Sequence, residues 1–252
     1  MNKPLHLEKS EVDTAIILAG GLGTRLWPVV RKVPKPMAPV QGRPFLLHLL
    51  EYWHRQGIRR FILSVGYKSN SIQDKLKKCW RKSSLEFVKE NKPHGTGGAL
   101  LLCLKRKNLK TPFLLLNGDT FFPVSLNKLE KHASEKKADW CLSLFSSKDN
   151  ERYLTVKLKK NHLISSLKDK MPIKKRQPKG LSNGGVYWVD PRVMRLFRPK
   201  KTPISLEKEI LPTIIRKGFR IVGFPSRDRF IDIGIPEDFK KAQTFPFKIQ
   251  KS

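Results

Sequence analysis

The sequence predicts an α/β fold, a single domain whose Rossmann-like mixed sheet is sandwiched by helices. Short apolar runs alternate with amphipathic segments up to Phe145, which is the pattern of parallel strands covered on both faces by helices. The chain of 252 residues can bury a full core and contains no convincing internal repeat or second-domain boundary. We expect the domain to span residues 13–243, with flexible ends at 1–12 and 244–252.

Strand and helix are expected to alternate in the first part of the chain. Residues 44–56 carry apolar side chains at helical spacing, with Pro44 suited to the first turn and Gly57 to the end. Continuous apolar runs predict buried strands, and Asn70, Ser71 and Ser125 are good N-caps. The expected order is strand 15–19, helix 44–56, strand 61–65, a helix to residue 80, strand 85–89, helix 98–104, strand 113–116, helix 126–136 and strand 140–145.

The later part of the chain is less regular. Residues 153–158 and 162–167 are expected to pair as strands around a turn at Lys160 and Asn161. The segment 171–180 is rich in proline and lysine and is interpreted as a loop. We expect the remaining elements to be strand 186–189, a helix from 206 to 216 capped by Ser205, strand 220–224 and a short strand near 230–233.

The net charge of +31 is the unusual feature of the composition. Such a charge attracts polyanions in general, nucleic acid included. The basic residues are spread along the whole chain, however, and no RNP string or basic zipper accompanies them. We therefore favour a solvated basic surface over a dedicated nucleic-acid site.

The cysteines and the hydropathy pattern indicate where in the cell the protein is expected and argue against a zinc site. Cys79, Cys103 and Cys141 are far apart and odd in number, which favours reduced thiols in the cytosol. The sequence has no Cys-x-x-Cys or His-x-x-x-His pair, so zinc has no support. No apolar run approaches the ~20 residues of a membrane helix, and the first residues lack the apolar core of a signal peptide. We expect a cytoplasmic protein without membrane insertion.

A glycine turn follows the first expected strand. Gly20, Gly21 and Gly23 let the backbone approach a ligand and direct several N–H groups at one anion. Arg25 follows at once, and Lys35 lies between two prolines. A Walker loop is absent, and the third glycine of a dinucleotide fingerprint is missing. The strand, the turn and the two cations together predict a polyphosphate site.

Two aspartates are candidates for a metal site. Asp119 follows an apolar strand in a tight turn, where an acidic residue can also serve only as a turn former. Asp232 lies between Ile231 and Ile233, and a carboxylate there is unfavourable unless it is paired or liganded. If both lie at the edge of the sheet beside a triphosphate, they form a hard-oxygen site for Mg²⁺.

The chain resembles the sugar-1-phosphate nucleotidyltransferases over nearly its whole length. The resemblance lies in blocks 20–36, 93–99, 116–122 and 230–239, which occur in the order of that family. It implies a GT-A-like nucleotidyltransferase domain without the left-handed β-helix extension that some members carry. It also implies transfer of a nucleotidyl group from a nucleoside triphosphate (NTP) to a sugar 1-phosphate, with a cytoplasmic role in polysaccharide biosynthesis and a possible homo-oligomer.

The resemblance also implies a role for each site residue. Arg25, Lys35, Asp119 and Asp232 are the implied catalytic residues, and the two aspartates hold Mg²⁺. The implied nucleotide-binding residues are Leu18, Ala19, Gly20, Gly21, Gly23, Thr24 and Arg25, with Gly95, Thr96, Gly97 and Gly98 against the base. The implied sugar-phosphate-binding residues are Asp169, Lys170, Asn183 and Gly184.

Within the family, the heptose 1-phosphate guanylyltransferases share the most strings with this chain. Examples are Gly-Thr-Gly-Gly-Ala (95–99) and Asn-Gly-Asp-Thr-Phe-Phe (117–122). The small Gly97 and Gly98 suggest room for a purine, which favours GTP. Asp169 stands where the family usually has a glutamate, and Leu154 where it often has a glycine. These two departures leave the identity of the sugar undecided. Mannose 1-phosphate guanylyl transfer, uridylyl or thymidylyl transfer, and a catalytically weak regulatory protein on the same fold are the alternatives.

Overall fold

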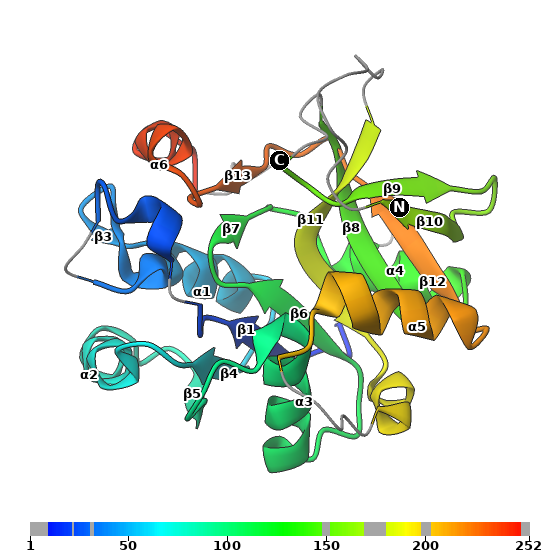
Figure 1. The fold of residues 1–252 in the computed structure, drawn as a ribbon, viewed down its shortest axis with the longest axis horizontal. Coiled ribbons are helices and arrows are strands. Elements are labelled where there is room, and N and C mark those ends of the chain that lie inside the picture. The colour runs from blue at the N-terminus through cyan, green and yellow to red at the C-terminus, as the bar shows by residue number, and fades with distance from the viewer. Residues whose placement is uncertain are drawn as a thin grey trace, which may run out of the picture.

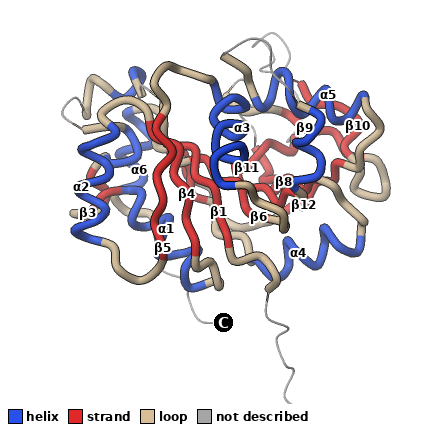
Figure 2. The backbone as a smooth tube through the Cα atoms, turned by 90° about the horizontal axis from the view of Figure 1, so that it is seen from below, coloured by secondary structure: helices blue, strands red, loops and turns tan. Residues whose placement is uncertain are grey.

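A nine-stranded mixed sheet forms the centre of the molecule (Figure 1). The computed structural model describes residues 10–21, 23–30, 33–147, 152–168, 180–197 and 203–247, and the description below concerns these. One half of the sheet is β1 (Thr14–Leu18), β4 (Arg60–Val65), β5 (Ser84–Lys89) and β6 (Phe113–Asn117). These four strands are parallel, in the order β6-β1-β4-β5 (Figure 2). Their carboxyl ends therefore meet at one edge, where open α/β sheets bind ligands.

The other half of the sheet is mixed. The long strand β11 (Gly180–Val189) runs antiparallel to β6 and to β8 (Trp140–Ser147), and β12 (Ile221–Pro225) pairs parallel with β8. The hairpin of β9 (Thr155–Leu158) and β10 (Ile164–Lys168) extends this half through β11. The register of β11 against β8 shifts between Asn183 and Tyr187, so the strand carries a bulge there.

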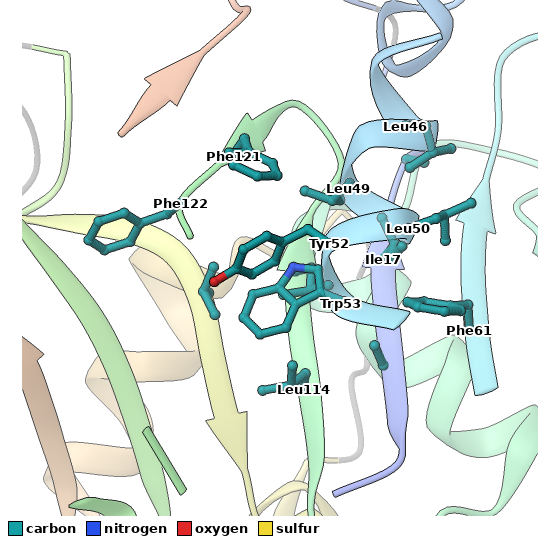
Figure 3. Close-up of a cluster of buried hydrophobic side chains, with 14 of the residues drawn as sticks. Ile17, Leu46, Leu49, Leu50, Tyr52, Trp53, Phe61, Leu114, Phe121 and Phe122 are labelled. Atoms are coloured by element: carbon teal, nitrogen blue, oxygen red, sulfur yellow. The ribbon is translucent and has the colours of Figure 1, made fainter. Parts of the chain in front are cut away.

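Two helical layers cover the sheet, because successive side chains of a strand point to opposite faces. On one face Ala15 and Ile17 pack with α1 (Phe45–Arg55), α2 (Ser69–Cys79) and α4 (Leu126–Glu135). On the other face Ile16 packs with α3 (Gly95–Lys107), the π-helical turn Leu206–Ile210 and α5 (Leu211–Arg216). Figure 3 shows the first face, where Trp53 lies between helix and sheet and Tyr52 donates a hydrogen bond to the Val124 carbonyl at 3.0 Å.

Short elements complete the fold. Those along the carboxyl edge are the 3₁₀ turns Thr24–Leu26 and Lys35–Met37, the pair β2 (Pro39–Val40) and β3 (Arg43–Pro44), the pair β7 (Thr120–Phe121) and β13 (Ile231–Asp232), and α6 (Pro236–Ala242). The 3₁₀ turn Pro191–Leu196 lies at the opposite edge, because the end of β11 pairs with the start of β6. β7 and β13 are antiparallel, with Asp232 opposite Thr120. Among the described residues, no helix is both long and apolar enough to cross a membrane.

The α/β fold and most of the expected elements are confirmed. The helix expected at 98–104 begins earlier, at Gly95, because the Ile204 carbonyl accepts the N–H groups of Gly97 and Gly98 and fixes the first turn. Ser205 caps the helix at 206–216 as expected, but its first turn is π-helical. The loop expected at 171–180 lies outside the described residues except for Gly180, which begins β11.

The described parts of both chain ends, which were expected to be flexible, make contacts with the domain. Val12 is buried in the core, and Ser10 hydrogen-bonds to the Glu130 carboxylate. At the other end Phe247 stacks on His48 with ring centroids 4.2 Å apart, and Phe245 lies 5.9 Å from Phe121. Aromatic side chains that find apolar partners order the backbone that carries them.

Candidate active site

A cleft of about 980 Å³ opens at the carboxyl ends of β1, β4, β5 and β6. It is lined by Leu18, Ala19, Gly20, Gly21, Gly23, Arg25, Lys35, Pro36, Gly66, Tyr67, Lys89, Glu90, Asn91, Lys92, Pro93, Gly95, Thr96, Ala99, Asn117, Asp119 and Gly234. Four of these side chains are cationic and two are acidic, and the backbone of the glycine turn forms one wall. This composition suits a polyphosphate ligand.

The glycine turn at the end of β1 is shaped by close backbone approach. Gly23 has a φ of +65°, and a Cβ there would come within 2.6 Å of the Lys35 Cβ. Glycine is therefore required for the turn to continue into the 3₁₀ turn at Thr24–Leu26 beside Lys35. The Thr24 side chain lies outside the described residues, whereas the exposed Arg25 lines the cleft as expected.

Lys35 connects the two aspartates that the sequence singled out. Its Nζ donates to Asp119 Oδ2 and lies 3.8 Å from Asp232 Oδ1, although 84 and 197 residues separate the aspartates from Lys35 in the chain. The β7–β13 pair brings the two acids together, and the Ile233 N–H donates to the Asp119 carbonyl at 3.0 Å. The Lys35 side chain is 8% exposed and the Asp119 side chain 37%, so the lysine side of this contact is shielded from solvent.

The electrostatics of Asp232 follow from this position. Burial and then the neighbouring Asp119 carboxylate raise the pKa of Asp232, while Lys35, the Gly234 N–H and Arg152 act in the opposite direction. Asp232 Oδ1 accepts the Gly234 N–H at 2.6 Å. Two carboxylates that converge on one cation are the hard-oxygen donor set that a divalent cation prefers. No group of three or more His, Cys, Asp or Glu with metal-site geometry occurs in the described ranges.

The loop at the start of α3 is divided between the cleft and the protein interior. Gly95 and Thr96 line the cleft, but Gly97 and Gly98 are not among the lining residues. A Cβ on Gly97 would come within 2.6 Å of Ile210, and one on Gly98 within 2.9 Å of His94. These two glycines therefore allow α3 to pack closely, and the argument that they leave room for a purine has no support from the geometry.

Glu90 is one of several cleft residues that the sequence analysis missed, as are Gly66, Tyr67, Lys89, Lys92 and Asn117. Its side chain is 7% exposed, and its carboxylate accepts hydrogen bonds from Ser64 Oγ at 2.9 Å and from the His94 N–H at 3.3 Å. These bonds hold an acidic group at the end of β5 against the cleft. The sequence offered the same signal for Glu90 as for Asp119, because each is an acidic residue that follows an expected strand.

Two of the expected sugar-binding residues, Asn183 and Gly184, lie on β11 in the mixed half of the sheet. Asn183 is fixed at both ends of its amide, since Nδ2 donates to Tyr187 Oη at 2.6 Å and Oδ1 accepts the Gly185 N–H at 3.1 Å. Its backbone N–H donates to the Leu154 carbonyl at 3.0 Å. Neither Asn183 nor Gly184 lines the cleft, and Asp169 and Lys170 lie outside the described residues.

An aromatic cluster stands next to these residues. Phe145 and Phe230 stack with centroids 4.0 Å apart, and Tyr153 packs edge-on against both. Phe122 meets the same pair and lies where a Cβ on Gly184 would stand. The cluster thus borders the carboxyl edge between Asn183 and the β7–β13 pair.

Comparisons with known proteins agree with this geometry. The sequence model of the family described as "Nucleotidyl transferase" matches residues 14–248. The D-glycero-alpha-D-manno-heptose 1-phosphate guanylyltransferases of Campylobacter jejuni and Aneurinibacillus thermoaerophilus are 38% and 39% identical to this chain, over 89% and 91% of it and 96% of each relative. The crystal structure of HddC from Yersinia pseudotuberculosis complexed with GMP-PN matches with a TM-score of 0.79 and 34% identity, covering 92% of this chain and 98% of that one.

Proposed function

Since this chain belongs to the nucleotidyl transferase family, we propose that it transfers a guanylyl group from GTP to D-glycero-α-D-manno-heptose 1-phosphate, giving GDP-heptose and pyrophosphate. The observation that carries this proposal is the contact of Lys35 with Asp119 and Asp232 at the edge of a cleft with cationic walls. That arrangement offers a cation and two hard-oxygen ligands where the phosphates of two substrates would meet.

The nucleotide half of the proposal uses the glycine turn and Arg25. The backbone N–H groups of Gly20, Gly21 and Gly23 and the Arg25 guanidinium would bind the β- and γ-phosphates. Leu18, Ala19, Gly95 and Thr96 would contact the nucleoside, because they line the same cleft. Gly97 and Gly98 keep only a packing role in this proposal.

Glu90 supports guanine as the base. Guanine presents its N1–H and its 2-amino group side by side, and one carboxylate can accept both hydrogen bonds. Uracil and thymine present one N–H between two carbonyl oxygens, which a carboxylate repels. The hydrogen bonds from Ser64 and from the His94 backbone would orient Glu90 for this task.

The part of the site that would bind the sugar 1-phosphate is proposed from the sequence blocks shared with the family and from the two named relatives. Asn183 and Gly184 would contact the sugar, and Asp169 and Lys170 keep their expected roles toward the sugar hydroxyls and the sugar phosphate. The bulky Leu154 lies next to Asn183 through a backbone hydrogen bond, so it would shape the sugar pocket.

The proposed reaction is an in-line displacement that needs no general base. The sugar phosphate has a second pKa near ~6, so it is largely ionised at neutral pH. One of its oxygens would form a bond to the α-phosphorus of GTP while the bond to the bridging oxygen breaks and pyrophosphate leaves. Lys35 would hold the attacking phosphate against the α-phosphate and offset their repulsion. Mg²⁺ held by Asp119 and Asp232 would supply further charge neutralisation.

A pyrophosphate-release assay tests this proposal. The purified protein would be given each of GTP, ATP, UTP and dTTP with a panel of sugar 1-phosphates that includes heptose and mannose. We expect GTP with the heptose 1-phosphate to give the highest kcat/KM. Faster turnover with UTP or dTTP would contradict the guanine assignment, faster turnover with mannose 1-phosphate would reassign the sugar, and no turnover with any pair would favour the regulatory alternative.

The free thiols of Cys79, Cys103 and Cys141 accord with a cytoplasmic location.

A further inference from the structure

Asp232 stands between two cations that each have a closer carboxylate partner. Lys35 Nζ is 3.8 Å from Asp232 Oδ1 but is in direct contact with Asp119. On the other side, Arg152 Nη2 is 3.8 Å from Asp232 Oδ2 but 2.5 Å from Asp238 Oδ2. Asp232 therefore has a positive charge near each oxygen without a short ion pair to either of the two.

Asp238 is a buried acid to which the proposed reaction gives no task. It lies in the first turn of α6, and its side chain is 8% exposed. Lys241 Nζ donates to its other oxygen at 3.0 Å, so both carboxylate oxygens are occupied. A carboxylate this buried is stable only when it is paired, and Arg152 and Lys241 are the two cations that pair with it.

α6 is held in place at its C-terminal end, where Gln243 is the C-cap. The Gln41 N–H donates to Gln243 Oε1 at 3.0 Å, and the Gln243 amide donates to the Pro39 carbonyl at 3.2 Å. Ala242 is fully buried in the core. Because α6 is fixed by these contacts, Asp238 can act as a stationary anchor for the Arg152 side chain.

We propose that Asp238 is a positioning residue that holds Arg152 away from Asp232 and so keeps the Asp232 carboxylate accessible to the divalent cation. This inference rests on the proposed role of Asp232 as a metal ligand. In the described part of the chain, Asp232 is the carboxylate besides Asp238 that lies within 4 Å of the Arg152 guanidinium. Without Asp238, this guanidinium can form a short, two-pronged pair with Asp232. A cation in direct contact with Asp232 would then compete with the metal for the same oxygens.

The experiment measures Mn²⁺ binding to the nucleotide-free protein by electron paramagnetic resonance of the unbound ion. Asp238→Asn should weaken binding by about tenfold, because the Coulomb attraction between Arg152 and Asp232 grows when 3.8 Å becomes a direct contact. Asp238→Asn combined with Arg152→Met should return the affinity to within about twofold of wild type, since the competing cation is gone. Glu237→Gln, an exposed neighbour on α6, is the matched control and should change nothing.

Rescue by Arg152→Met is the decisive readout, because a merely structural role of Asp238 would not be repaired by removing a second ion-pair partner. Equal Mn²⁺ affinity of Asp238→Asn and wild type would overturn the inference, and so would a double variant as weak as Asp238→Asn. Asp232→Asn separates this failure from that of the proposed function. If Asp232→Asn binds Mn²⁺ as well as wild type, the metal assignment itself fails and the inference falls with it.

Discussion

Glu90 and Gly20 lie in direct contact at the cleft, since a Cβ on Gly20 would come within 2.1 Å of Glu90 Oε1. The end of β5 thus lies directly against the glycine turn that follows β1. The acid proposed to bind the base and the backbone proposed to bind the phosphates are parts of one wall. A substitution of Gly20 should therefore displace the Glu90 carboxylate, and a substitution of Glu90 should affect the glycine turn.

Glu90→Gln tests the base assignment. A neutral amide keeps the size of the side chain and can still accept from Ser64, but it accepts only one of the two guanine N–H groups well. We expect kcat/KM for GTP to fall by about 10- to 100-fold, because a buried donor without a charged acceptor costs about 1–3 kcal/mol. The measurement is a comparison of GTP with UTP under identical conditions.

A loss of the same size with both nucleotides would contradict a role of Glu90 in reading the base. Gly20→Ala provides an independent check, because its methyl group must push the Glu90 carboxylate away. We expect it to reproduce the selective loss with GTP, whereas Gly21→Ala, whose methyl group would meet nothing within 4 Å, serves as the backbone control.

Lys35→Met should affect turnover and stability through the same contact. Removal of the ammonium leaves Asp119 and Asp232 facing each other without their shared cation. We expect kcat to fall by about 100-fold or more, and the Tm in EDTA to fall by about 5 °C. Added Mg²⁺ should restore part of the Tm, which differential scanning calorimetry can measure.

The matched control is Lys92→Met, an exposed lysine that also lines the cleft. Added Mg²⁺ should change the Tm of Lys92→Met by no more than it changes the Tm of wild type. If Lys35→Met loses activity without any Mg²⁺-dependent change of Tm, the shared-cation account of the two aspartates is wrong.

Glu86 should give stability that depends on pH. Its hydrogen bonds to Arg60 and then to Lys107 lower its pKa from 4.5 to about 2. A folded-state pKa below the unfolded one contributes stability above pH 4.5, and this contribution disappears as the pH falls toward 2. Glu86→Gln should therefore lower the Tm by about 2 °C at pH 7, and its curve should meet that of wild type near pH 2. A constant difference in Tm across this range would contradict the ion pair.

Phe247→Ala tests the packing of the C-terminal segment. Phe247 stacks on His48 and meets the Phe121 ring with centroids 4.9 Å apart, two residues from Asp119. Loss of a half-buried aromatic ring should lower the free energy of unfolding by about 2 kcal/mol, measured by urea titration. Leu196→Ala, at a side chain that is 44% exposed, is the control and should stay within about 0.5 kcal/mol of wild type. Equal small losses in both variants would show that the segment adds nothing to stability.

The fold and half of the site follow from local patterns. The strand at β1, the glycine turn, Arg25 and Lys35 are adjacent in sequence, so their chemistry is visible there. Asp119 and Asp232 were identifiable as unusual acids, but the β7–β13 pairing that joins them depends on long-range contacts. The same holds for Arg152 and Asp238, which look like ordinary surface charges in the sequence.

Two features of the structure depend on long-range contacts that a single sequence does not contain. The sequence suggested that Gly97 and Gly98 leave space for the base. The neighbours that need the space at Gly97, Ile204 and Ile210, lie more than 100 residues away, whereas His94 is the close neighbour of Gly98. The C-terminal segment was expected to be flexible, and its Phe245 and Phe247 contact aromatic side chains of α1 and β7 that lie far away in the sequence.

The turnover of Asp232→Asn in saturating Mg²⁺ tests the central claim most directly. The variant keeps the shape of the side chain and removes the charge, and its folding is checked by its Tm. We predict that kcat for GTP and the heptose 1-phosphate falls by about 100-fold or more while the Tm stays near that of wild type. A folded variant with nearly the wild-type rate would contradict the account.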